Sequence, residues 1–263
     1  MVNSPLTSPA VCYGMHPTPS RPRAGFTLTE LAVVLVIIGL LLGAVMAGRD
    51  LIRHAEINAS LKDIEKIKMG VAAYKMRRGL PGDHSAAEQR WGSAPSCPGN
   101  ASSGTCNGNG NGRIDSMLYT GSEATFFWQH LGLAGLIEGS FAPNWPLGSL
   151  DATYAPHLTI EQWGVMATHG LDDAYFYPNA PQLTYLLIGR LNTQTYMTGY
   201  ANPAVTCYEA RAIDGKIDDE KPSSGMVQGL RTRCTDTLDP LAASSARYTP
   251  TVNDETILGM RAE

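Results

Sequence analysis

A single acidic side chain, Glu30, stands at the start of a long apolar stretch. Residues 25–30 read Gly-Phe-Thr-Leu-Thr-Glu, and residues 31–48 contain no charged residue. A charged side chain at membrane depth costs roughly 2.5 to 3.5 kcal/mol on insertion scales, so it marks a function and needs a partner. The chemistry that this spacing indicates is charge pairing in an apolar environment, with the positive group supplied by a second chain.

Two simpler interpretations of this stretch stay open. An ordinary secretory signal would use Arg21 and Arg23 as its basic region and Val45-Met46-Ala47 as its cleavage site, but its apolar core spans only about 7 to 15 residues. An uncleaved signal anchor would cross the bilayer once through residues 31–48. Their length just allows this at about 1.5 Å per residue across a hydrocarbon core of about 30 Å.

Gly25, Phe26 and Glu30, followed by the apolar stretch, closely resemble the prepilin processing site of type IV pilins and type II secretion pseudopilins. The resemblance implies that a prepilin peptidase cuts after Gly25 and methylates the new amino terminus at Phe26. It also implies that Glu30 of one subunit neutralises the Phe26 amine of a neighbour. At contact distance that attraction is about 4 kcal/mol at an effective dielectric of 20, against about 1 kcal/mol in water, so the pairing favours one axial stagger.

The residues after the apolar stretch continue as a helix. No proline occurs in residues 26–78, and apolar residues recur at steps of three and four, which is one face of a helix: Leu61, Ile64, Ile67, Val71 and Tyr74. The sequence therefore predicts one helix that ends at Leu80-Pro81-Gly82-Asp83. Gly39 and Gly43 are four residues apart, a spacing that lets helices approach closely in lipid. We expect them at the assembly contact, although ordinary membrane-helix glycines share this spacing.

The predicted fold class is α+β: a long amino-terminal helix, transmembrane in its first half, packed on a small antiparallel sheet with long loops, as in pilins. We expect a cleaved leader at 1–25, a transmembrane and filament-core helix at 26–50, its amphipathic continuation at 51–80 and a globular carboxyl-terminal domain at 81–263. Within that domain the patterns predict helices within 123–138 and 201–216, a strand at 183–190, and weaker strands at 159–167 and 226–233. Residues 74–83, 128–137 and 213–225 are also similar to segments of large prepilin-type proteins from Gram-negative bacteria.

The cysteine count predicts disulfides. Cys12 lies in the expected leader, and the four that remain are Cys97, Cys106, Cys207 and Cys234. An even number beyond a translocation signal favours disulfides in an oxidising compartment. We favour pairing of nearest neighbours in sequence, Cys97 with Cys106 and Cys207 with Cys234, while the other two connectivities and free buried thiols stay open.

Two segments offer oxygen ligands for a cation. The first is a glycine-rich loop whose donors would be Asn107, Asn109, Asn111 and Asp115. Its oxygens are nearly all amides, and Leu118 stands where an EF-type calcium loop has a bidentate glutamate, so a cluster of Asx turns is the alternative. The second is the acidic group Asp214, Asp218, Asp219 and Glu220, with a solvated helix end as its alternative. No other metal or cofactor is expected.

Several functional classes have no support in the sequence. No zinc-protease, nucleophile-elbow or phosphate-binding motif is present, so we expect no enzyme activity. The formal net charge of −4 gives no basic footprint for nucleic acid. Cleavage after Gly25 would remove Arg21 and Arg23 and make the mature chain more acidic.

The expected function is therefore structural. We expect a subunit, of the minor class because of its size, of a type IV pilus or a type II secretion pseudopilus. Its partners would be other pilin subunits, the prepilin peptidase and methyltransferase, an inner-membrane assembly platform and membrane lipid. Before assembly it would cross the inner membrane of a Gram-negative bacterium once, with its carboxyl-terminal domain in the periplasm. The alternative is a membrane-tethered adhesin or receptor module that uses a pilin-like anchor.

Overall fold

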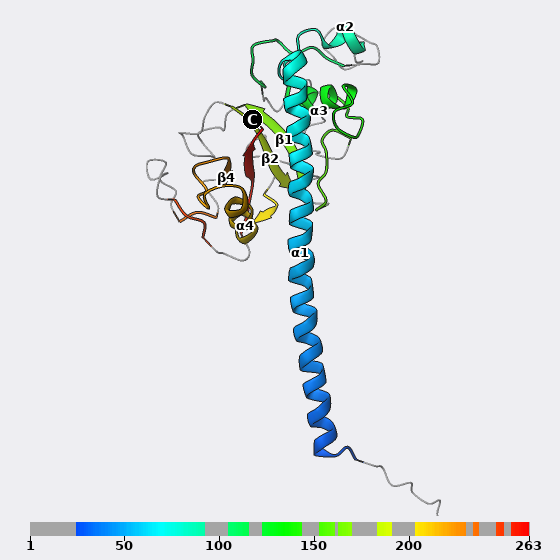
Figure 1. The fold of residues 1–263 in the computed structure, drawn as a ribbon, viewed down its shortest axis with the longest axis vertical. Coiled ribbons are helices and arrows are strands. Elements are labelled where there is room, and N and C mark those ends of the chain that lie inside the picture. Colours follow the sequence, from blue (N-terminus) through cyan, green and yellow to red (C-terminus); the bar gives the residue numbers. More distant parts are fainter. Residues whose placement is uncertain are drawn as a thin grey trace, which may run out of the picture. The chain divides into compact units, whose positions relative to one another are not determined.

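A computed structural model of the protein describes residues 25–92, 105–115, 123–143, 153–160, 163–169, 183–190, 203–229, 234–236, 246–249 and 254–262. The chain divides into two compact units, Met1–Asp50 and Leu51–Glu263. The fold is α+β and pilin-like, with a long amino-terminal helix and a small antiparallel sheet (Figure 1). This confirms the predicted fold class.

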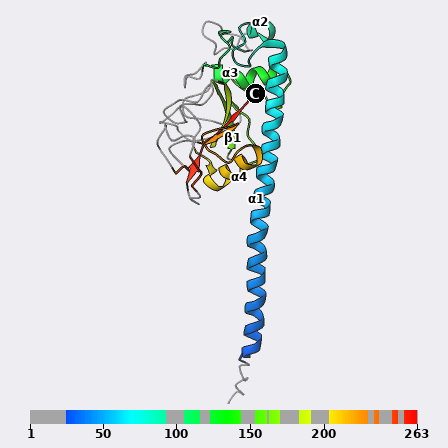
Figure 2. The same ribbon diagram turned by 60° about the vertical axis from the view of Figure 1, so that its left-hand side comes forward.

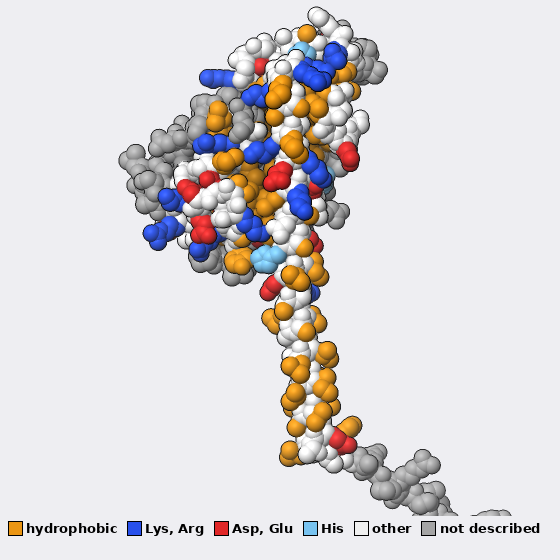
Figure 3. All heavy atoms as spheres, viewed as in Figure 1, with side chains coloured by type: hydrophobic (Ala, Val, Ile, Leu, Met, Phe, Trp, Pro, Cys, Tyr) orange, Lys and Arg blue, Asp and Glu red, His pale blue; other side chains and the backbone are white. Residues whose placement is uncertain are grey.

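Helix α1 runs from Leu28 to Arg78 and has 51 residues, close to the predicted range. Its part in the first unit carries apolar side chains at most positions from Leu31 to Met46, and these are exposed. Figure 3 shows one face of this stretch. By length and composition α1 is able to cross a membrane. In the second unit the predicted face is buried at Ile64, Ile67, Val71 and Tyr74. The residue that follows the helix, Gly79, has a φ of +79°, which glycine adopts without strain and which ends the helix.

The second unit contains two antiparallel sheets. The larger has the strand order β1-β2-β6-β4 and the smaller pairs β3 with β5. Figures 1 and 2 show the strands as arrows. Their bounds are β1 (Trp163–His169), β2 (Thr184–Arg190), β3 (Val205–Thr206), β4 (Val227–Gly229), β5 (Glu255–Thr256) and β6 (Leu258–Arg261). All of β2 except its last residue is buried, so the middle of the sheet forms the core of this unit together with the buried face of α1.

The helices of the second unit differ from the prediction in their ends. Helix α3 (Glu123–Leu133) stops before residue 138, because Gly135 takes a φ of +67°. Helix α4 (Cys207–Ile217) starts later than residue 201. Its start is fixed by a capping box in which Thr206 and Glu209 bond each other's backbone amides. The short helix α2 (Ala87–Trp91) and the carboxyl-terminal strand β6 were not predicted.

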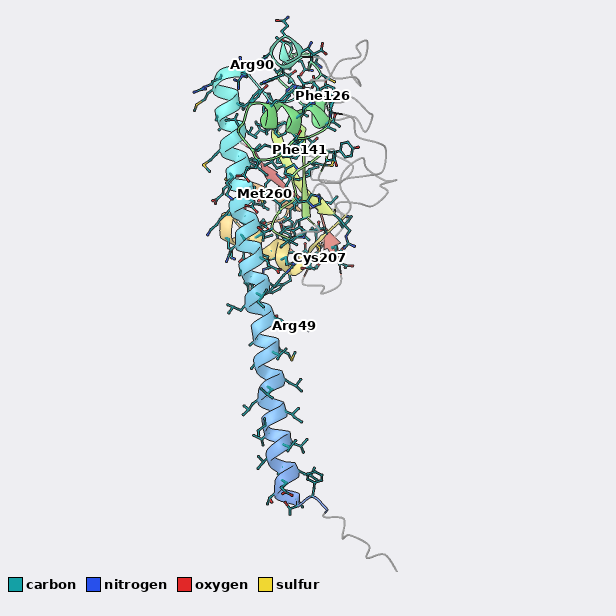
Figure 4. The ribbon with its side chains drawn as sticks, turned by 90° about the vertical axis from the view of Figure 1, so that its right-hand side faces the viewer. Arg49, Arg90, Phe126, Phe141, Cys207 and Met260 are labelled. Carbon is teal, nitrogen blue, oxygen red and sulfur yellow. A yellow bond between two sulfur atoms is a disulfide. The ribbon has the colours of Figure 1, made fainter. Side chains whose placement is uncertain are left out.

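Two contacts hold the amino-terminal end of α4. Cys207 forms a disulfide with Cys234, with a Cα–Cα distance of 5.1 Å; Figure 4 labels Cys207. Glu209 accepts a hydrogen bond of 2.5 Å from Arg53 Nε in the second-unit part of α1. The Arg53 guanidinium also lies 5.5 Å from the centre of the Trp163 ring. Helix α4 is therefore fixed both to α1 and to the strand-bearing part of the unit.

A buried histidine joins the end of α1 to α3. His130 is fully buried, and its Nδ1 accepts a hydrogen bond of 2.9 Å from the Gly82 backbone amide. Its Nε2 lies 2.9 Å from the Cys106 carbonyl oxygen. Nε2 must therefore carry the proton in a neutral ring. Burial is the main reason that the pKa of His130 falls from 6.5 to about 4.

We expect the stability of the protein to fall as the pH drops from 6.5 towards 4. The unfolded chain takes up a proton at His130 below about pH 6.5, whereas the folded chain resists protonation until about pH 4. The loss over this window is about 3 kcal/mol. The measurement is the urea unfolding free energy of the full chain in detergent at a series of pH values.

The variant His130→Gln separates this effect from other titrating groups, because its amide cannot gain a charge. Between pH 6.5 and 4 the unfolding free energy of His130→Gln should decrease less than that of the parent protein. His157→Gln changes an exposed histidine, so its unfolding free energy should decrease as much as that of the parent. An unchanged pH dependence in His130→Gln would contradict the assignment.

Candidate functional site

Glu30 caps the beginning of its own helix. Its Oε2 accepts hydrogen bonds from the Thr27 backbone amide at 2.7 Å and from the Thr27 hydroxyl at 2.8 Å. The Glu30 amide in turn donates to Thr27 Oγ1 at 3.2 Å. This reciprocal pair is a capping box, which satisfies backbone amides that have no partner inside the helix. Thr27 thus belongs to the site, although the sequence interpretation assigned it no role.

The expected cleavage site lies just before this cap. Phe26 is 82% exposed, and, its chain neighbours apart, no described atom lies within 4 Å of a Cβ placed on Gly25. Residues 1–24, the rest of the expected leader, lie outside the described part of the chain. The Gly25–Phe26 peptide bond therefore stands clear of other described side chains and directly precedes a capped helix.

Gly39 and Gly43 have open surroundings within the single chain. Apart from the neighbouring residues and backbone of its own helix, a Cβ placed at either position would meet no described atom within 4 Å. The fold of one chain therefore gives no reason for glycine at these two positions. Their expected role in assembly stays a prediction.

The predicted disulfide residues are only partly described. The bond between Cys207 and Cys234 is present, and Cys106 is disulfide-bonded. Its expected partner Cys97 lies outside the described residues.

The asparagine-rich loop is the glycine-rich segment that carries the four proposed calcium ligands, residues 107–115. Two acidic side chains that the sequence interpretation did not include, Asp83 and Glu123, hold it in place. Both oxygens of Asp83 accept hydrogen bonds from the loop backbone, with Gly110 at 2.6 Å and Gly112 at 2.7 Å. Glu123 accepts from the backbone amides of Asn109 at 2.7 Å and Asp115 at 2.8 Å. Both acids lie outside the loop itself, so their role could not be read from its spacing.

The four proposed calcium ligands of this loop take part in its own hydrogen bonds. Asn107 Oδ1 accepts from the Glu88 amide at 2.8 Å. Asn109 and Asn111 each accept from the backbone amide two residues ahead, which makes two Asx turns. Asp115 Oδ2 accepts from the side-chain amides of both asparagines. Calcium binding by these residues stays a prediction.

In the second acidic group, the structure brings three members together. Carboxylate oxygens of Asp214, Asp218 and Asp219 lie within 4.8 Å of one another. Glu220 instead pairs with Arg211 at 3.3 Å.

The comparisons with known proteins concern the amino-terminal segment. Residues 20–46 match the family model described as the prokaryotic N-terminal methylation motif. No curated protein and no solved structure matches the chain. The matched segment includes Gly25, Phe26 and Glu30 together with residues 28–46 of α1, whose apolar side chains are exposed.

The motif indicates processing at the amino terminus, and the helix indicates membrane anchoring. A segment of this kind is processed by a prepilin peptidase and assembles with other pilin subunits, and the apolar helix that follows it is suited to anchor the protein in a membrane. Residues 20–46 are thus a prepilin-type signal, the amino-terminal signature of type IV pilins and pseudopilins.

Proposed function

We propose that this protein is a structural subunit, of the minor class, of a type IV pilus or a type II secretion pseudopilus. It is cut after Gly25 and assembles through the helix that begins at Leu28. The observation that carries this proposal is the methylation motif at residues 20–46, followed directly by an apolar helix whose side chains are exposed in the single chain.

The exposed apolar helix needs an apolar environment. Leu35 is 69% exposed and Leu40 is 71% exposed, and covering one such side chain is worth about 1.5 to 3 kcal/mol relative to water. Lipid covers these side chains before assembly, and neighbouring helices cover them in a filament. Since lipid is as apolar as leucine, apolar contact alone gives neighbours little advantage over lipid.

A charge pair between Glu30 of one subunit and the Phe26 amine of the next favours a neighbouring subunit over lipid, which apolar contact alone does not. Cleavage after Gly25 creates a positive amine on Phe26, and Glu30 of a neighbouring subunit binds it. Within its own chain Glu30 accepts hydrogen bonds only through Oε2, as far as the described contacts go. A carboxylate has about four acceptor sites, so Glu30 can keep its cap and also bind the amine of a neighbour.

The proposal also includes where the protein lies in the cell and what kind of subunit it is. The helix crosses the inner membrane of a Gram-negative bacterium once before assembly, and the second unit lies in the periplasm, where the Cys207–Cys234 disulfide is stable. The protein is not an enzyme. The large second unit favours a minor subunit over a repeating major subunit.

Labelling of the filament tests whether the protein is a minor or a major subunit. Immunogold particles against the second unit should appear at one end of the filament. Labelling along its whole length would mean a major subunit. Labelling of the cell envelope in a strain that makes no filaments would favour a tethered adhesin or receptor module.

A further inference from the structure

The second unit carries exposed apolar side chains at the end where its chain begins. Leu51, the first residue of the unit, is 73% exposed, and Ile52 is 61% exposed. Tyr208, in the first turn of α4, is 61% exposed. We call Leu51, Ile52 and Tyr208 the entry surface of this unit. Exposed apolar side chains that gather at one end of a folded unit mark a surface for a partner.

Two hydrogen bonds to α1 place the first turn of α4 at this end. Near the start of α4, Glu209 accepts a hydrogen bond from Arg53 Nε. In the last turn of α4, Lys216 Nζ donates to Asn58 Oδ1 at 2.7 Å. Helix α4 therefore lies beside α1 (Figures 1 and 2), and its amino-terminal end, which includes Tyr208, is the end nearer the start of the unit.

The acidic side chains next to the entry surface are paired with a cation. Arg53 bonds Glu209 through Nε at 2.5 Å and Glu56 through Nη1 at 3.2 Å. The positive charge of Arg53 offsets part of the charge of these two carboxylates. They therefore repel a surface that carries phosphate groups less than unpaired carboxylates would.

The covalent chain keeps the entry surface close to a membrane that residues 31–48 cross. Leu51 follows Gly48, the last residue of this uncharged stretch, by three positions. Three residues span about 4.5 Å in a helix and at most about 10 Å when extended. The headgroup region extends roughly 5 to 8 Å beyond the hydrocarbon core on each side. Leu51 therefore lies at or next to the headgroups, whatever the arrangement of the two units.

We propose that the entry surface rests on the lipid bilayer, with Leu51, Ile52 and Tyr208 among the headgroups. Tyrosine suits this depth because its ring is apolar and its hydroxyl bonds water or headgroups, and tyrosine is enriched where membranes meet water. The entry surface also continues directly from the apolar stretch that lipid covers. This inference rests on the membrane anchoring in the proposed function and adds a lipid contact made by the second unit itself.

The opposite end of the second unit lies far from the entry surface. Figure 4 shows Cys207, the neighbour of Tyr208, and Arg90 at opposite ends of this unit. Met76, near the end of α1, is 87% exposed. It lies about 37 Å from Leu51 along the helix, at about 1.5 Å per residue. Met76 therefore provides an exposed position in the same unit that should not touch lipid.

The lipid contact would limit how the second unit turns at the membrane surface. The first turn of α4 is fixed to its unit by the Cys207–Cys234 disulfide and by Arg53. When lipid holds Tyr208, it therefore holds the whole unit and not a loose helix. A subunit that leaves the membrane for a filament must give up this contact.

The test is quenching of tryptophan fluorescence by lipids with brominated acyl chains. The full chain is reconstituted in vesicles of phosphatidylcholine and phosphatidylglycerol, with and without bromine. Tyr208→Trp keeps an aromatic ring, and the emission that it adds to that of the parent should fall at least twofold in brominated vesicles. The emission added by Met76→Trp should stay unchanged. Leu40→Trp, within the apolar stretch, is the reference for a residue inside the bilayer and should be quenched most strongly.

Further substitutions separate a contact with lipid from mere closeness to it. In the Tyr208→Trp protein, Leu51→Gln together with Ile52→Gln removes the apolar side chains of the entry surface and should reduce the quenching at least twofold. Met69→Gln is the matched control, because Met69 is a 64% exposed apolar residue of α1 outside the entry surface. This change should leave the quenching as it was.

The outcomes distinguish this proposal from membrane anchoring itself. Quenching of Leu40→Trp without quenching of Tyr208→Trp would overturn the lipid contact and leave the anchoring intact, and the entry surface would then be open to a neighbouring subunit. Equal quenching of Tyr208→Trp and Met76→Trp, or no effect of the glutamine pair, would also overturn it. Absence of quenching in Leu40→Trp would contradict both the anchoring and the contact.

Discussion

Glu30→Gln should leave the protein cut and membrane-inserted but should reduce its incorporation into filaments at least tenfold. Glutamine at the third helical position can still take part in a capping box, so the start of α1 is kept. The amide carries no charge, so it cannot neutralise the Phe26 amine of a neighbour. The measurement is the amount of the variant in sheared filaments relative to the membrane fraction, by quantitative immunoblotting.

Thr27 provides the matched control for this experiment. Thr27→Ala removes the hydroxyl that bonds both the Glu30 carboxylate and the Glu30 amide but keeps the charge. Loss of such a cap costs about 1 kcal/mol of helix stability, and incorporation should fall less than in Glu30→Gln. If Thr27→Ala assembles as poorly as Glu30→Gln, or if Glu30→Gln assembles normally, then helix capping and not charge pairing explains the acid.

Gly25→Leu should abolish processing. The peptidase must bind the chain around the Gly25–Phe26 bond, and a branched side chain at residue 25 would fill space that glycine leaves open. Intact-mass spectrometry of the purified protein should then find the leader still attached, whereas the parent protein should begin with a methylated Phe26. Without cleavage Phe26 has no free amine, so this variant should also be missing from filaments.

Gly48→Ala serves as the control for a glycine substitution in the same unit. A Cβ at Gly48 meets no described atom within 4 Å, so this variant should be processed like the parent. A parent protein whose mature chain begins at a residue other than Phe26 would contradict the proposed processing.

Local signals made most of the helices predictable. The buried face of α1 could be predicted because Ile64, Ile67, Val71 and Tyr74 recur at helical steps. All four side chains pack in the core of the second unit. Strand β2 could be predicted because residues 185–188 are four consecutive apolar or aromatic residues, and the strand lies inside the sheet between β1 and β6. By contrast, α4 begins where Thr206 and Glu209 form a capping box, and apolar spacing does not mark that position.

Pairing between distant segments could not be predicted. Strand β6 has only four residues, one of them glycine, and gives little local signal. It becomes a strand because it lies between β2 and β4, to both of which it is hydrogen-bonded. Tertiary context decides such short strands.

In the candidate sites too, local sequence identifies some residues, whereas others depend on the packing of distant segments. Gly25, Phe26 and Glu30 could be identified because their order is the signal itself. The Thr27-x-x-Glu30 pattern of a capping box is also present in the sequence, but the pattern does not distinguish an acid that caps its own helix from one that pairs with a neighbour. The burial of Asp214 depends on packing around the end of α4, and nothing in the local sequence distinguishes it from an exposed acid.

The hydrogen bonds between Thr27 and Glu30 also affect a subunit that has not yet joined a filament. In a single copy the Thr27 amide and hydroxyl already donate to the Glu30 carboxylate, and these neutral donors orient the carboxylate without cancelling its charge. The amine of a neighbouring copy could therefore bind Glu30 through its second oxygen while the bonds to Thr27 stay in place.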